Sequence, residues 1–160
     1  MEFSKVGPNF YRGSRPESAG DLYRIKDELG ISTIISLETG AGHFFDHILG
    51  RSFHEEEVWE KPSFNGEFIK FPLSNFSPPS CSELQAILET IEQCVNIREG
   101  VYLHCYAGVD RTGYVVAAWR VLQEGVHPEI AWREAVAKGM HGRFWWWANQ
   151  FKWDMNQLSK

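Results

Sequence analysis

Two residue types that can do phosphate chemistry stand close together in residues 104–113, whose sequence is HCYAGVDRTG. A cysteine thiolate is a strong nucleophile, and an arginine guanidinium can hold two phosphate oxygens at once. Cys105 and Arg111 carry these groups six positions apart. Gly108 allows the positive φ with which the intervening backbone N–H groups could wrap around an anion. This positive environment favours the thiolate, so the stretch predicts a nucleophile aimed at phosphorus.

The elements on either side of this stretch must position it. Residues 100–104 (GVYLH) predict a short buried strand, and an almost wholly apolar helix is expected over about 112–124. The N-terminus of that helix would face the turn and favour an anion there. Because open α/β sheets bind ligands at the carboxyl ends of their strands, we expect the site at the end of strand 100–104.

The rest of the chain alternates short apolar strands with amphipathic helices, which predicts an α/β fold. We expect an edge strand at 9–14, a helix from the capping pair Ser14 and Glu17 to Gly30, and a strand at 32–37. Residues 38–66 predict an irregular loop with a short helix near 43–49. A strand at 67–73 and a helix capped by Ser80 and Glu83 follow. The expected architecture is a central, mainly parallel sheet of four or five strands flanked by helices.

The C-terminal part is expected to be helical. One helix should run from His127 to about residue 138, and a tryptophan-rich helix should cover 142–158. An apolar stripe in the second helix predicts that it docks on the core. Trp146 and Trp153 fall on another face, which is either a second packing surface or a partner contact. We expect one domain, 1–160, with its catalytic half at about 67–140.

Composition narrows the class of protein. The 160 residues are 43% hydrophobic and 23% charged, with a net charge of -5, which argues against a nucleic-acid partner. Three cysteines without a CxxC pair favour a reducing compartment. No apolar stretch reaches the ~20 residues of a membrane span. We expect a soluble, cytoplasmic protein, although a leader removed beforehand would leave the same sequence. The oligomeric state stays open.

The stretch HCYAGVDRTG matches the HCxxGxxR[ST]G signature of the cysteine-dependent phosphatases, which include protein tyrosine, dual-specificity and inositol-phosphate phosphatases. Residues 10–40 also resemble the opening of small bacterial members. The resemblance implies a dual-specificity phosphatase fold, a phosphocysteine formed on Cys105, and no cofactor or metal. It implies that Arg111 stabilises the transition state, that Thr112 assists the thiolate and the hydrolytic step, and that His104 supports the loop. The implied phosphate-binding residues are Tyr106, Ala107, Gly108, Val109, Asp110 and Arg111.

The chain departs from the family pattern at the general acid. In relatives an aspartate lies on a loop written PxxDxxPP, whereas the matching PLSNFSPPS has Asn75. The protein could use another acid, act only on good leaving groups, or bind phosphorylated ligands without turnover. Asp110 resembles the aspartate in the CxxxxDR loops of myotubularin-type lipid phosphatases, where it is a proposed acid. It could instead pair with Arg111 or cap the helix. Weaker candidates are Asp46, Glu55, Glu56 and Glu57.

The same resemblance suggests inositol polyphosphates as the first substrate class, and a phosphoprotein as the alternative. A polyanionic ring needs cations around the pocket. The candidates for substrate contacts are Lys138, His141 and Arg143, with Arg12, Arg15 and Lys70 also available. Each of these could equally be an ordinary surface charge. His43 and His47 have the spacing of a metal-binding pair, but no third ligand supports a metal site.

Overall fold

A computed structural model describes residues 1–39, 48, 53–74, 76–97, 99–141 and 145–160. Five strands form one sheet in the order β1-β2-β5-β3-β4. The strands are β1 (Phe3–Gly7), β2 (Phe10–Gly13), β3 (Thr33–Ser36), β4 (Glu67–Lys70) and β5 (Val101–His104). Only the β1–β2 pair is antiparallel; β2, β5, β3 and β4 are parallel neighbours. The mainly parallel sheet predicted from sequence is therefore confirmed.

The N-terminal region differs from the prediction in two ways. The strand expected at the edge is β2, which lies between β1 and β5, because Asn9 at φ 58 lets the chain reverse and pair residues 3–7 with it. The first helix begins at Ala19, where the Ser18 side chain accepts a hydrogen bond from Asp21 N. The predicted Ser14 cap is thus wrong. Ser14 N instead donates to Glu2 O over 3.0 Å, at the open end of the β1–β2 hairpin.

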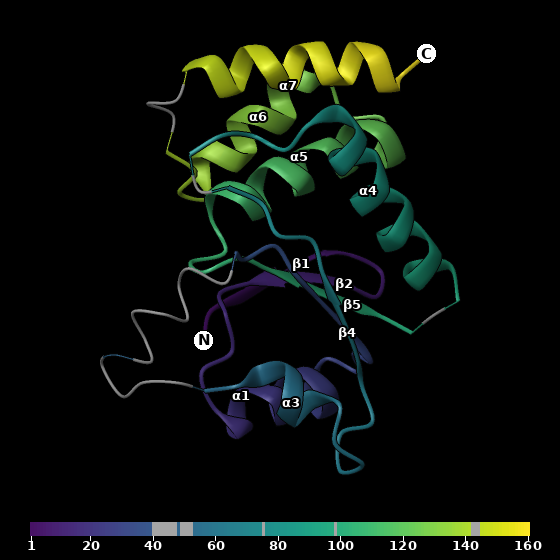
Figure 1. Ribbon diagram of the computed structural model, residues 1–160. Helices are drawn as coiled ribbons and strands as arrows, with labels where there is room; N and C mark the ends of the chain where they lie inside the picture. The colour runs from purple at the N-terminus through teal and green to yellow at the C-terminus, as the bar shows by residue number, and fades with distance from the viewer. Residues whose placement is uncertain (40–47, 49–52, 75, 98, 142–144) are drawn as a thin grey trace.

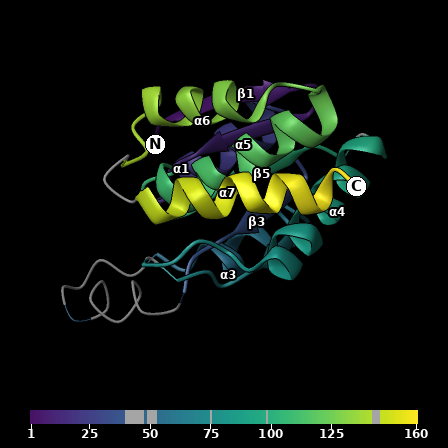
Figure 2. The same ribbon diagram turned by 90° about the horizontal axis from the view of Figure 1, so that it is seen from above.

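Helices cover both faces of the sheet (Figures 1 and 2). On one face lie α4, α5, α6 and α7, and on the other lie α1, the π-helical segment η1 and α3. Their bounds are α1 (Ala19–Tyr23), η1 (Arg24–Glu28), α3 (Glu55–Trp59), α4 (Cys81–Asn96), α5 (Asp110–Glu124), α6 (Pro128–Ala137) and α7 (Trp145–Leu158). The flanked sheet gives the α/β layering expected from the alternating pattern.

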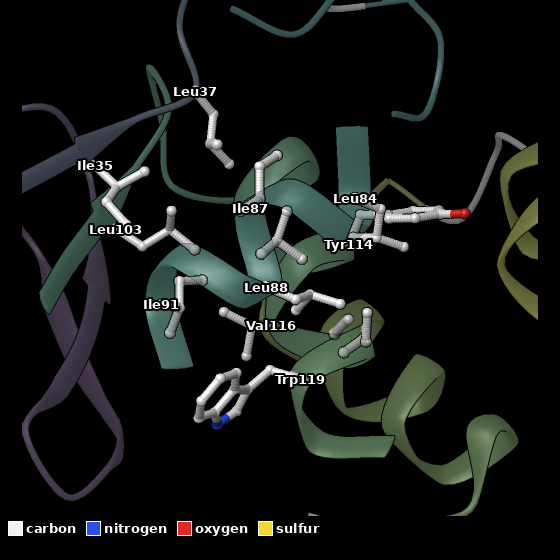
Figure 3. Packing of buried hydrophobic residues seen from close by; sticks show 14 of the residues in the cluster. Ile35, Leu37, Leu84, Ile87, Leu88, Ile91, Leu103, Tyr114, Val116 and Trp119 are labelled. Carbon is white, nitrogen blue, oxygen red and sulfur yellow. The ribbon is translucent and has the colours of Figure 1, made fainter. Parts of the chain in front are cut away.

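Alternation along the central strands supplies a core on each face. In β3, Ile35 belongs to the cluster under α4 and α5, whereas Ile34 belongs to the cluster beside α1 and α3. In β5, Leu103 and Tyr102 divide in the same way. Figure 3 shows the first cluster, where side chains of α4 and α5 meet those of β3 and β5. Burial on both faces holds β5 rigidly, and with it the residue that follows.

Two helix predictions are confirmed in detail. Ser80 and Glu83 form a reciprocal capping box at the start of α4. In α7, Trp147, Phe151 and Met155 are buried as the apolar stripe predicted. Trp145, Trp146 and Trp153 are exposed.

A buried hydrogen bond ties α7 to α5. Tyr114 Oη donates to Asp154 Oδ2 over 2.6 Å, and both side chains are fully buried. Burial and the nearby carboxylate raise the pKa of Tyr114, which keeps the phenol in its donating form. Gln150 Nε2 donates to the other carboxylate oxygen over 2.8 Å. The C-terminal helix is therefore fixed to the helix that follows the cysteine loop.

The sequence analysis missed one helix in the irregular region. Residues 55–59 form α3, whose Trp59 is fully buried against Phe64 in the second cluster. Except for residue 48, the helix expected near 43–49 lies outside the described residues. Among the helices that the structure describes, none is long and apolar enough to cross a membrane.

Candidate active site

The cysteine loop joins the end of β5 to the start of α5, as the sequence predicted. Cys105 directly follows the strand and is 3% exposed, while Arg111 is the second residue of the helix. Gly108 has φ +71, and a Cβ there would lie 2.2 Å from Gly13 O. A side chain at this position would clash with the backbone at the end of β2. The loop therefore needs glycine for its conformation and for this close approach.

Backbone carbonyls hold the Arg111 side chain in a buried position. Its Nη1 donates to Leu37 O over 3.2 Å and to Leu73 O over 3.3 Å. These carbonyls lie just past the ends of β3 and β4, so the sheet itself orients the guanidinium. Within the described ranges, Nε and Nη2 of Arg111 make no hydrogen bond to protein. That edge is available for a bidentate contact with phosphate oxygens.

Two more side chains near the loop, those of Arg12 and Thr112, are buried. Arg12 Nη2 donates to Gly108 O over 2.8 Å, and burial lowers the pKa of Arg12 although the charge of Cys105 opposes that shift. With its Nη2 bound to a carbonyl and its side chain buried, Arg12 is a support for the loop, unlike the surface charge considered from sequence. Thr112 is also buried, and its Oγ1 finds no hydrogen-bond partner among the residues that the structure describes.

His104 lies behind the loop and is fully buried. Its Nδ1 is 3.1 Å from Cys105 O, and its Nε2 is 3.1 Å from Glu55 Oε2. Glu38 Oε2 lies 3.9 Å from Nδ1, and Arg15 Nη1 lies 3.6 Å from Glu38 Oε1. Burial acts to lower the pKa of His104, but the two carboxylates and the Cys105 carbonyl outweigh it, so the pKa is raised. The loop therefore rests on a buried network of paired charges.

The carboxylates of Glu38 and Glu55 were not expected in this network. Glu55 was considered as a weaker candidate for the general acid, in an acidic run of a kind that is usually solvated, and Glu38 was not singled out. The signal that could have found Glu38 is its place two positions past β3, the strand that neighbours β5 in the parallel sheet. The ligating atoms of Glu38, Glu55 and His104 lie within 4.8 Å of one another, a set that could hold a metal. Arg15 already lies beside the Glu38 carboxylate, and the His104 imidazole lies beside that of Glu55.

The predicted acid Asp110 is paired with His141 and not with Arg111. His141 N donates to Asp110 Oδ1 over 2.9 Å, and His141 Nδ1 lies 3.0 Å from both carboxylate oxygens. The two residues are 31 positions apart, and both side chains reach solvent. The structure thus brings together one predicted catalytic residue and one predicted substrate contact at the rim of the loop.

The remaining predicted cations fall into three groups. Lys138 lines a cavity of about 220 Å³ together with the loop residues Ala107, Gly108 and Val109, so it lies beside the site. Lys70 pairs with Glu56, and the Arg15 guanidinium lies 4.9 Å from the centre of the Tyr106 ring. The third group is Arg143, which lies outside the described residues. Four other residues named from the sequence also lie outside them: Asp46, His43, His47 and Asn75.

A buried cysteine and arginine on one strand–loop–helix unit fit the arrangement expected of a cysteine-dependent phosphatase, and comparisons with known proteins identify the family. A family model described as "Polymorphic toxin system, DSP-PTPase phosphatase" matches residues 6–125. The chain belongs to this family, and the protein is a hydrolase of phosphate esters. No curated protein matches the chain significantly.

Solved structures show the same fold. The active form of Tk-PTP is 22% identical with a TM-score of 0.70, and the match covers 96% of this chain and 93% of that one. PTPMT1 in complex with PI(5)P is 16% identical with a TM-score of 0.75, and 99% of each chain is covered. The catalytic core of the PP-IP phosphatase SIW14 from S. cerevisiae, in complex with citrate, is 17% identical with a TM-score of 0.73, covering 94% and 83%. At these identities the likeness establishes the fold alone.

Proposed function

We propose that the protein hydrolyses phosphomonoesters through a phosphocysteine on Cys105. In the first step the thiolate attacks phosphorus, the S–P bond forms, and the bond to the leaving oxygen breaks. Arg111 holds two of the equatorial oxygens as charge develops on them. The observation that carries this proposal is the pairing of a buried cysteine with an arginine whose Nη1 is anchored by the carbonyls of Leu37 and Leu73. This arrangement orients the guanidinium before substrate binds.

In the second step water attacks the phosphocysteine, and inorganic phosphate and the thiolate are released. Thr112 is our candidate for stabilising that thiolate, because its buried hydroxyl has no other partner in the described part of the chain. Asn75 has no acidic proton to give to the leaving group. The leaving-group proton must therefore come from another group, and Asp110, directly before Arg111, is the candidate that the sequence offers.

Inositol polyphosphates are the proposed substrates. Lys138 borders the loop from the end of α6 and could meet a second phosphate of a ring held at Cys105. The similar solved structures include a phosphatase bound to PI(5)P and a phosphatase named for inositol pyrophosphates. Both observations favour a polyanionic substrate.

A tyrosine or dual-specificity protein phosphatase is the second candidate. Tyr106, in the loop itself, is 53% exposed and stacks against the Arg15 guanidinium. An aromatic side chain in this place could pack against the ring of phosphotyrosine.

Turnover of a panel of inositol polyphosphates and phosphopeptides separates these functions. We expect wild-type protein to release phosphate from inositol polyphosphates, and Cys105→Ser to abolish turnover of every member. Cys81→Ser, at the start of α4, is the matched control and should keep full activity. Turnover of phosphopeptides alone would favour the second candidate. If wild-type protein binds the panel without releasing phosphate, the proposed reaction is wrong.

A further inference from the structure

We propose that His141 is the residue that delivers the proton to the leaving oxygen, and that Asp110 positions its imidazole ring. This inference rests on the proposed function and names a catalytic residue within it. It replaces a single carboxyl by a carboxylate–imidazole pair, and so answers how a chain with Asn75 at the usual acid position could still protonate a poor leaving group.

The first argument is the geometry of the pair. Nδ1 of His141 lies 3.0 Å from both oxygens of Asp110, and the His141 backbone N donates to Oδ1 over 2.9 Å. Two contacts to one carboxylate fix both the position and the rotation of the ring. An Nδ1–H that donates to a carboxylate leaves Nε2 as the atom that can exchange a proton. In hydrolases with a Ser-His-Asp triad, the aspartate orients the histidine by accepting a hydrogen bond from Nδ1–H in the same way.

The second argument is the anchoring of the segment that carries His141. A Cβ at Gly139 would lie 3.5 Å from Val109 Cγ1, and a Cβ at Gly113 would lie 3.3 Å from Met140 Sδ. Met140 is itself buried. Residues 139–141 thus pack along the loop and the first turn of α5, and His141 is held beside the residue that precedes Arg111.

The third argument is accessibility. The His141 side chain is 53% exposed and that of Asp110 is 28% exposed, so the ring stands at the open rim of the loop. Oδ1 of Asp110 accepts a hydrogen bond from His141 N, and both carboxylate oxygens lie 3.0 Å from His141 Nδ1, so both are already engaged by His141. Within the described residues His141 Nε2 makes no hydrogen bond, so of the two residues His141 is the one with a nitrogen that can meet a substrate oxygen.

The proton balance is complete with these groups. In the first step Nε2–H of the imidazolium passes its proton to the leaving oxygen as the P–O bond breaks and the S–P bond forms. The neutral imidazole then takes a proton from the attacking water as the new P–O bond forms and the S–P bond breaks. The imidazolium and the Cys105 thiolate are regenerated, and no other reactant is needed.

The test compares leaving groups. For His141→Asn we expect kcat/KM on an alkyl phosphate such as an inositol phosphate to fall by about 10²-fold, the usual scale of general acid catalysis. On an activated aryl phosphate, whose leaving group needs no proton, the fall should be about threefold or less. His141→Gln is a second variant with the same expectation. His127→Asn is the matched control, because His127 is exposed at the far end of α6 and asparagine can replace it as the N-cap.

The pH profile distinguishes a proton donor from a purely structural residue. Within the described residues, Asp110 is the charged group that contacts the His141 ring, and Lys138 at the end of α6 is the cation three positions away. The basic limb of kcat/KM on the alkyl phosphate should vanish in His141→Asn.

Three outcomes would overturn this inference: equal slowing of alkyl and aryl phosphates in His141→Asn, an unchanged basic limb in that variant, or a leaving-group effect in Asp110→Asn that His141→Asn lacks. The last would return the acid to Asp110. Failure of the proposed function looks different, because Cys105→Ser would then leave aryl phosphate turnover intact.

Discussion

Two imidazole–carboxylate pairs flank the cysteine loop, and they differ in exposure more than in geometry. Behind the loop, His104 and Glu55 are 3.1 Å apart with side chains 0% and 4% exposed. At the rim, His141 and Asp110 are 3.0 Å apart with side chains 53% and 28% exposed. A buried pair cannot exchange protons with a substrate, and its charges are strongly coupled because water does not screen them. The difference in exposure therefore favours a structural role for the His104–Glu55 pair and proton transfer for the His141–Asp110 pair.

The buried pair has a clear mechanical role. His104 ends β5 and contacts the Cys105 carbonyl, so its ring supports the start of the loop. Glu55 is the first residue of α3, and Glu38 lies two positions past the end of β3. The network thus links the loop to α3, on the face of the sheet opposite α5, and to the segment that follows β3.

The largest effect that would test this contrast is the loss of stability on removing Glu55. Glu55→Ala leaves the buried imidazole without its closest carboxylate, and breaking a buried pair in this way costs about 3–5 kcal/mol. We expect a loss of that size in the free energy of unfolding, measured by urea denaturation. Glu57→Ala, an exposed position in the same helix, is the control and should change it by about 0.5 kcal/mol or less. A loss below about 1 kcal/mol for Glu55→Ala would remove the distinction between the pairs.

A second test uses pH. The pKa of His104 is raised in the folded protein, so its contribution to stability is fully present below its unfolded pKa of ~6.5. That contribution is lost as the pH rises through the folded pKa. The free energy of unfolding of wild-type protein should therefore fall in this window relative to Glu55→Gln, in which the carboxylate charge is absent. Parallel pH curves for the two proteins, from urea unfolding between about pH 5.5 and 9, would contradict the assignment.

The smallest effect concerns the rim pair. His141→Asn should change the free energy of unfolding by about 1 kcal/mol or less, because exposed ion pairs contribute little. Repeating the urea titration in 1 M salt, where the Debye length is about 3 Å, should reduce even that difference. A loss comparable to that of Glu55→Ala would show that the rim pair is structural, and would weaken its role in proton transfer.

Local sequence was enough to predict the loop but not its partners. Cys105, Gly108 and Arg111 lie within one strand–turn–helix unit, so their spacing alone indicates the cradle. The Asp110–His141 pair spans 31 positions, and His141 was predicted only as a candidate substrate contact. No periodicity in residues 38–66 indicated that Glu55 would turn inward on a short helix.

The helices and strands of the fold were likewise predictable where the local sequence signal is strong. The apolar runs of β3, β5 and α5 and the capping box of α4 are strong local signals, and the structure contains all of them. Strand β1 was missed because its five residues, which end in Gly7 directly before Pro8, carry too little alternation to indicate a strand. Its place at the edge is decided by the turn at Asn9 and by pairing with β2.

The hydrogen bond between Tyr114 and Asp154 has a consequence for local opening. Because α7 can leave α5 only by exposing an unpaired carboxylate and phenol, the amide protons of the two helices should exchange with solvent as one cooperative unit. The last helix lies beyond the residues that the family model matches, yet it would share the protection of the helix that carries Arg111.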